Sequence, residues 1–191
     1  REGAARGAPD TRWGWFPSVA LGWDLKQEAL FRDASALSSL KFRASYGITG
    51  NQNINSAYAY IPTYYLSDNV SQYQFGDNYY AMYTPSSYDQ SLKWERTAST
   101  NIGVDFGFAG QRIYGSIDVY NKHTTDLLAT VNIPAGTNFT NQLLTNIGAM
   151  TSKGVELNLA LVPVRTTDVD WTINLNASYN NSKITTLLAH A

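Results

Sequence analysis

A strict alternation of apolar and small polar residues constrains this chain more than any other feature. In 101–108, for example, Ile102 and Val104 alternate with Gly103 and Asp105. A period of two indicates β-strands with two different faces, and none of the apolar faces carries a charge. Strands of 8 to 13 residues approach the ~9–11 that cross a bilayer at a tilt. The predicted strands span 13–25, 40–50, 101–108, 113–120, 155–162 and 171–180.

Composition favours a membrane-embedded wall over a soluble domain. Charged residues make up 15% of the 191, against roughly 25% in soluble domains, whereas aromatic residues reach 13%. A soluble domain needs a charged surface, while a transmembrane barrel has an apolar lipid face and a polar lumen. We therefore predict an all-β fold: about six strands of a larger antiparallel, up-and-down transmembrane β-barrel.

Several other classes of protein find no support. The net charge of −1 gives no overall attraction for nucleic acid. The absence of cysteine excludes disulfides and thiolate metal sites. His123 and His190 are isolated, and no nucleophile–base pattern, paired carboxylates or phosphate loop occurs. We predict no enzymatic activity, no metal and no cofactor.

The connections between strands alternate in length. Phe108 to Ile113 reads as a two-residue hairpin, with Gly110 placed for the positive φ of a type II′ turn. Short turns at one end and long loops at the other are typical of outer-membrane barrels. The predicted extracellular loops are 51–99 and 121–154. A helical turn within 28–37 is expected between the first two strands.

Several motifs are spread along nearly the whole chain. RWGWFPS at 12–18 precedes Gly22 and Trp23, and LKFRASYGITGNQ follows at 40–52. Further stretches are LKWE at 92–95, NIGVDFG at 101–107, GSIDVYNK at 115–122, TTDLL at 124–128, NIGAM at 146–150 and KGVEL at 153–157. In this order, the motifs resemble the SusC/RagA family of TonB-dependent outer-membrane transporters.

The resemblance implies a 22-stranded barrel in the bacterial outer membrane, plugged by an amino-terminal domain. It implies uptake of a nutrient, an oligosaccharide or peptide, held jointly with a SusD-like surface lipoprotein and energised by the TonB complex. We expect 1–191 to be an internal fragment of the barrel domain, without the plug and without the TonB box. Six strands cannot close such a barrel, so the fragment alone is not expected to transport.

The expected loop 51–99 is rich in tyrosine, whose ring stacks on sugars or peptide groups and whose hydroxyl forms hydrogen bonds. Alternatively, these residues pack the loop on itself, line the aromatic belt or contact the lipoprotein. The candidate substrate contacts are Tyr58, Tyr60, Tyr64, Tyr65, Tyr79 and Tyr80.

Charged and tryptophan side chains divide between the two predicted faces. Five charged residues fall on the lumen face, either as a polar track for substrate or plug, or as cross-strand neutralisation. They are Lys41, Arg43, Asp105, Asp118 and Glu156. Four tryptophans fall near strand ends on the outward face, where amphipathic rings favour the membrane interface. They are Trp13, Trp15, Trp23 and Trp171.

Two alternatives to an energised importer remain open at this point. One is a passive porin or adhesin-like barrel with no TonB coupling. The other is a soluble all-β carbohydrate-binding sandwich, which would cover the apolar faces with a second sheet.

Overall fold

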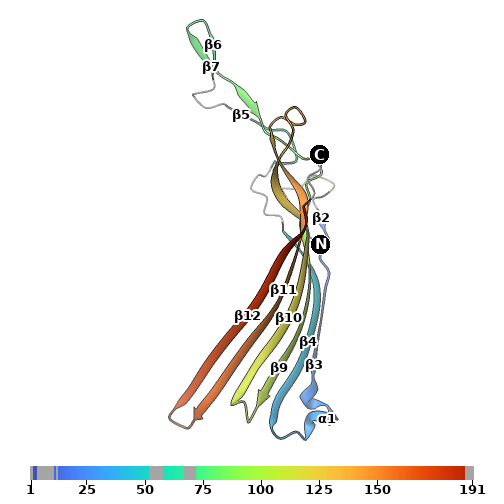
Figure 1. The fold of residues 1–191 in the computed structure, drawn as a ribbon, viewed down its shortest axis with the longest axis vertical. Coiled ribbons are helices and arrows are strands. Elements are labelled where there is room, and N and C mark those ends of the chain that lie inside the picture. The colour runs from blue at the N-terminus through green and yellow to red at the C-terminus, as the bar shows by residue number, and fades with distance from the viewer. Residues whose placement is uncertain (1, 4–10, 12, 52–57, 67–71, 188–191) are drawn as a thin grey trace.

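One antiparallel sheet dominates the computed structural model, which describes residues 2–3, 11, 13–51, 58–66 and 72–187. Its strand order is β12-β11-β10-β9-β4-β3, so the long strands neighbour one another in chain order. Figure 1 shows them as a tall, curved wall. The strands are β3 (Ser18–Asp24), β4 (Leu37–Asn51), β9 (Glu95–Phe108), β10 (Ile113–Asn132), β11 (Gln142–Arg165) and β12 (Asp170–Leu187). The prediction of an all-β, antiparallel fold is confirmed.

Shorter elements lie at the two ends of the wall. The connection from β3 to β4 holds η2 (Leu25–Gln27) and α1 (Ala29–Arg32), as the expected helical turn within 28–37 requires. Near the other end, β1 (Glu2–Gly3) pairs with β2 (Trp13–Gly14). No helix in the described part of the chain has the length and hydrophobicity to cross a membrane.

The predicted strand 13–25 is interrupted at 15–17 and ends one residue early. β2 stops at Gly14, β3 starts at Ser18, and Leu25 already belongs to η2. Pro17 lies in the interruption, and proline has no N–H to donate to a ladder. Its carbonyl still accepts a hydrogen bond from Ile48 N at 2.9 Å, so pairing resumes directly after it.

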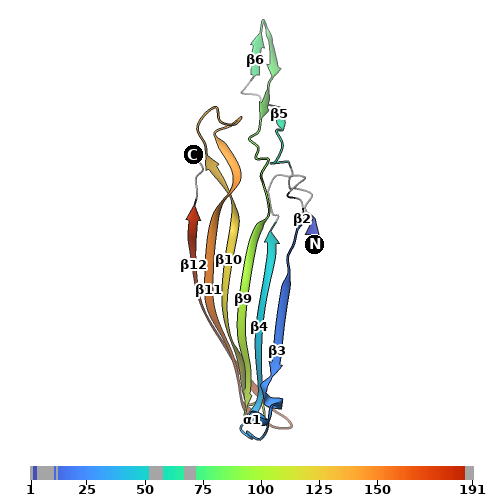
Figure 2. The ribbon, with the colours of Figure 1, turned by 90° about the vertical axis from the view of Figure 1, so that its right-hand side faces the viewer.

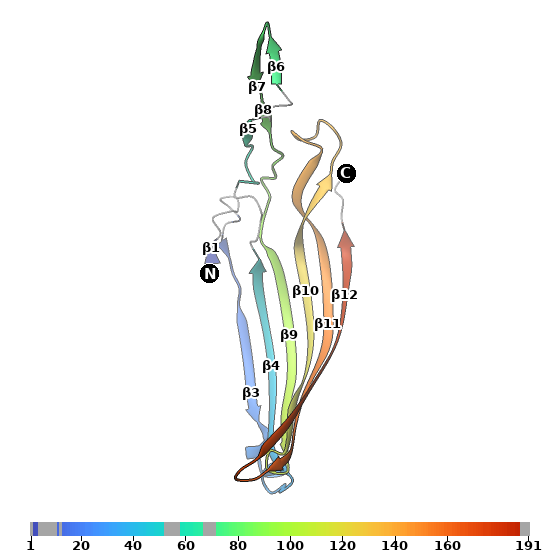
Figure 3. The same ribbon diagram turned by 90° about the vertical axis from the view of Figure 1, so that its left-hand side faces the viewer.

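The expected loop 121–154 is wrong over most of its length. β10 continues to Asn132 and β11 starts at Gln142, paired as Asn132↔Gln142, which leaves only 133–141 as a loop. The paired strands extend as a ribbon past the other long strands (Figure 3). The ladder shifts register between Thr124 and Leu128, which interrupts the alternation of the two faces, so the sequence pattern ends before the strands do.

The expected loop 51–99 contains strands of its own. β9 already begins at Glu95, and two short ladders form an arm that extends past the wall (Figure 2). The ladders are β5 (Tyr64–Leu66) with β8 (Tyr83–Pro85), and β6 (Gln72–Phe75) with β7 (Asn78–Ala81). Residues 52–57 and 67–71 of this loop lie outside the described residues.

The turn between β9 and β10 has the predicted register but a different conformation. Phe108 pairs with Ile113, as expected. The loop is four residues long, with positive φ at Ala109 (51°), Gly110 (65°) and Gln111 (63°), instead of the two-residue type II′ turn. Its successive N–H groups have an acceptor outside the turn: Ser38 Oγ lies 2.8 Å from Gly110 N and 3.2 Å from Gln111 N. This acceptor compensates for the strain of left-handed non-glycine residues.

The sheet's apolar face is uncovered. The register lines up one apolar row across all six strands: Trp23, Phe42, Val104, Ile117, Leu157 and Ala177. In the next row, Ile102 is 48% exposed and Val119 is 50% exposed. No second sheet covers these rows within the described residues. An apolar face that is left uncovered fits the wall of a membrane barrel, whereas a soluble sandwich covers this face with a second sheet.

Candidate functional site

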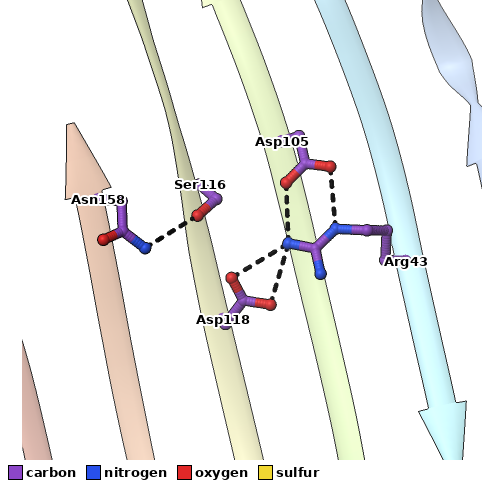
Figure 4. A network of polar contacts seen from close by, with 5 residues as sticks. All are labelled: Arg43, Asp105, Ser116, Asp118 and Asn158. Atoms are coloured by element: carbon purple, nitrogen blue, oxygen red, sulfur yellow. Dashed lines mark hydrogen bonds and ion pairs between the residues drawn. The ribbon is translucent and has the colours of Figure 1, made fainter. Parts of the chain in front are cut away.

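Three charged side chains from three strands meet on the face opposite the apolar rows (Figure 4). Arg43 on β4 donates to both carboxylate oxygens of Asp105 on β9, through Nε at 2.9 Å and Nη2 at 2.8 Å. The same Nη2 lies 3.0 Å from Oδ1 of Asp118 on β10. A bidentate guanidinium–carboxylate pair fixes the orientation of both groups.

Gly103 makes this contact possible. The register places it on β9 between Arg43 and Asp118, on the same face. A methyl group there would overlap the Asp118 carboxylate and approach within 2.9 Å of Arg43 Nη2. The bare backbone of β9 thus lets the arginine lie across one strand to reach the next.

The surrounding surface is polar and forms hydrogen bonds across the strands. Beside the charged cluster, Asn158 donates to Ser116 Oγ at 3.3 Å (Figure 4). Farther toward the loops, the hydroxyls of Thr97 and Thr124 lie 2.9 Å apart. Such a face offers a polar solute hydrogen bonds. In the described residues it holds no cluster of three or more His, Asp or Glu side chains that could bind a metal.

Lys41 and Glu156 share this face but stay outside the cluster. Lys41 lies opposite Asp105 and Glu156 lies opposite Asp118 in the register. Neither forms an ion pair with another described residue. Of the five lumen candidates the structure therefore joins Arg43, Asp105 and Asp118, an arrangement that fits the cross-strand neutralisation considered above.

Most of the candidate tyrosines stand on the arm with their rings in the open. Tyr60 is half-buried, and the other five are between 54% and 63% exposed. The Tyr64 ring contacts Phe139, at 6.4 Å between centroids. Phe139 also contacts Tyr88, at 5.9 Å. The arm is thus packed at its base and open toward its tip.

Polar residues that sequence reasoning missed hold the base of the arm. Asp89 accepts a hydrogen bond from Thr145 at 2.5 Å. Asn146 binds the backbone of Lys93 in both directions, accepting from its N–H and donating to its carbonyl, each at 3.0 Å. The only sequence signal was that Asn146 and Lys93 fall in two of the family-like stretches, without any indication that they meet.

The four tryptophans occupy both ends of the wall and are 50% to 72% exposed. Trp23, near the end of β3, and Trp171, near the start of β12, lie at the short-turn end. Trp13 and Trp15 precede β3, at the loop end. Trp23 Nε1 donates to Glu28 Oε1 at 2.9 Å, so its polar edge points away from the apolar rows.

The comparisons with known proteins agree with this sheet geometry. A family model described as the TonB dependent receptor-like β-barrel matches residues 2–188, nearly the whole chain. The chain belongs to this family. The sheet of this TonB-dependent receptor barrel has one apolar face and one polar face.

Individual relatives of this receptor barrel are of the SusC and RagA type, which confirms the resemblance found in the sequence. The TonB-dependent receptor SusC of Bacteroides thetaiotaomicron is 45% identical over 186 residues, 97% of this chain and 18% of that protein. TonB-dependent receptor P39 of Formosa agariphila is 34% identical over 189 residues, 96% of this chain and 17% of that protein.

Solved structures agree with the sequence relatives. A chain of the RagAB peptide importer in its "closed-closed" state superposes with a TM-score of 0.84 at 25% identity, covering 99% of this chain and 20% of that one. The "open-open" state gives 0.82 at 26% identity, covering 98% and 20%. This chain therefore spans about a fifth of the length of the proteins it matches.

Proposed function

We propose that this chain forms part of the wall of an outer-membrane, TonB-energised nutrient importer that works with a SusD-like lipoprotein. The observation that carries the proposal is the contrast between the two faces of one sheet. Apolar rows without charges cover one face, and the other carries the Arg43 cluster among Ser, Asn and Thr side chains. Lipid on one side and a wet lumen on the other require this contrast.

The height of the apolar face supports a bilayer crossing. On β12 the outward residues run from Trp171 to Tyr179 through Ile173, Leu175 and Ala177. Eight steps of about 3.3 Å span about 26 Å along the strand, or about 20 Å of membrane at a tilt of ~40°. That approaches the ~25 Å apolar band of outer-membrane barrels. Tryptophans at both ends would then lie at the two interfaces.

The proposed nutrient is an oligosaccharide or a peptide. The exposed phenol rings of the arm offer stacking surfaces and hydrogen bonds for either class. RagAB, which has a similar fold, is a peptide importer, and this supports the peptide branch. The arm and the 133–141 loop lie at the same end of the wall (Figure 3), and we place this end at the cell surface.

Uptake by the full-length transporter in cells tests this function. Cells receive labelled oligosaccharide or peptide mixtures, with and without a working TonB complex. We expect uptake of one class, its loss without TonB, and a several-fold weaker uptake for the Tyr79→Ala/Tyr80→Ala variant. Tyr114→Ala, near the opposite end of the wall, is the matched control. Uptake that persists without TonB would indicate a passive barrel instead.

A further inference from the structure

Charged residues are distributed unequally between the two faces of the wall. On the inward face, cations and carboxylates are mixed, as in the Arg43 cluster. The outward face, from the row of Phe108 to the row of Arg96, carries cations and no carboxylate in the described strands. Its basic side chains all lie on the loop side of the apolar rows. They are Arg96, His123, Lys153 and Lys183.

The two lysines lie just above the last apolar row. That row runs Ile102, Val119, Val155 and Tyr179. One row farther toward the loops stands Lys153, between Asn121 and Asn181. The row after that holds Lys183, opposite Thr151. Two lysines on neighbouring strands thus lie at the boundary between the apolar and polar parts of the outward face.

A hollow joins these lysines to the apolar surface below them. Its volume is about 760 Å³, and Lys153, Lys183 and Asn181 line it together with Ile102, Val119 and Val155. Both lysines are exposed, and neither forms an ion pair with a carboxylate of the described chain. Their positive charge is therefore not neutralised by any described neighbour.

We propose that this hollow binds an anionic membrane lipid, with a phosphate held by Lys153 and Lys183 and an acyl chain lying on Ile102, Val119 and Val155. Lysine extends its ammonium to the headgroup level while its stem stays on apolar surface. A basic residue near anionic headgroups contributes attraction. The continuous apolar floor favours a lipid over a free phosphate ion. The lumen lies on the other face, so a transported nutrient would not reach this hollow.

This inference rests on the proposed membrane placement, with the lipid in the leaflet on the loop side. The binding experiment uses the purified full-length transporter in detergent, with phosphatidic acid and phosphatidylcholine as probes and native mass spectrometry as the readout. We expect phosphatidic acid to bind about thirty-fold more tightly, since two basic residues contribute about 2 kcal/mol together. The Lys153→Gln/Lys183→Gln variant should lose this preference, and Lys153→Arg/Lys183→Arg should keep it.

Matched controls separate a site from bulk charge. Lys122→Gln removes one charge at the height of Lys153 but on the inward face, and we expect it to keep the full preference. Lys153→Gln alone should lower it about five-fold. An undiminished preference in the double Gln variant, an equal loss in Lys122→Gln, or displacement of the lipid by millimolar inorganic phosphate would overturn the proposal. If the double Gln variant does not fold, the Lys153→Arg/Lys183→Arg variant provides the test. Loss of the preference for phosphatidic acid in that variant would overturn the proposal.

Uptake measured on the same variants keeps this proposal distinct from the importer. Normal TonB-dependent uptake without any lipid preference in the wild type would refute the lipid site and leave the importer standing. A thirty-fold lipid preference without uptake would refute the importer and leave the site standing.

Discussion

Arg43 Nη2 lies 3.0 Å from Asp118 Oδ1, although the strand that carries Asp105 runs between them. The arginine spans β9 at Gly103, the only residue type that leaves its side-chain space empty. One guanidinium thereby joins β4, β9 and β10 on the inward face. The contact between Arg43 and Asp118 therefore depends on Gly103, although Gly103 has no side chain that could bond to either of them.

Gly103→Ala should separate Arg43 from Asp118 and destabilise the barrel. The added methyl overlaps the cluster, and overpacking of this kind costs about 1–3 kcal/mol. Urea titration of the full-length protein in lipid vesicles measures the loss as a lower midpoint. Asn101→Ala, on the same strand and face, is the control and should change the midpoint less. Equal midpoints for wild type and Gly103→Ala would contradict the role of Gly103.

Ser38→Ala should loosen the turn at 109–112 that joins β9 to β10. Ser38 Oγ accepts from the N–H groups of Gly110 and Gln111, and loss of such an acceptor costs about 1 kcal/mol. Hydrogen exchange at these two amides should become about five-fold faster. Ser35→Ala provides the control, since Ser35 is exposed and outside this network. Unchanged exchange in Ser38→Ala would show that water replaces the hydroxyl.

Phe139→Ala should release the base of the arm from the 133–141 loop. The Phe139 ring contacts both Tyr64 and Tyr88, and truncation removes both contacts at once. We expect faster proteolysis and hydrogen exchange within 58–66, with the wall unaffected. Phe75→Ala, near the exposed tip of the arm, is the comparison and should leave 58–66 unchanged. Protection of 58–66 as in the wild type would show that Phe139 does not hold the arm.

Sequence alternation predicted the wall well because one face of each strand is apolar. The register of Phe108 with Ile113, and of Val104 with Ile117, follows from matching the two apolar faces. Where the two faces of a strand no longer differ in this regular way, the sequence does not predict the strand. The ribbon from Asn121 onward is paired through its backbone, which no period of hydrophobicity reports.

The candidate site was partly predictable for a related reason. Period two placed Arg43, Asp105 and Asp118 on one face, but contact between them required the register of three strands and the gap at Gly103. Asn146 and Lys93 are 53 residues apart, and their hydrogen bonds join strand β11 to the segment before β9, which has no repeating pattern. Contacts of this kind are set by tertiary structure alone.

Which face of the wall meets lipid is the central claim, and cysteine labelling tests it directly, because the chain has no cysteine of its own. Single cysteines replace the outward Ile117 and Leu157 and the inward Ser116 and Asn158 in the full-length protein in membranes. We predict that a water-soluble maleimide reaches the inward pair many times faster than the outward pair. Equal labelling of both pairs would contradict the membrane wall on which the account is built.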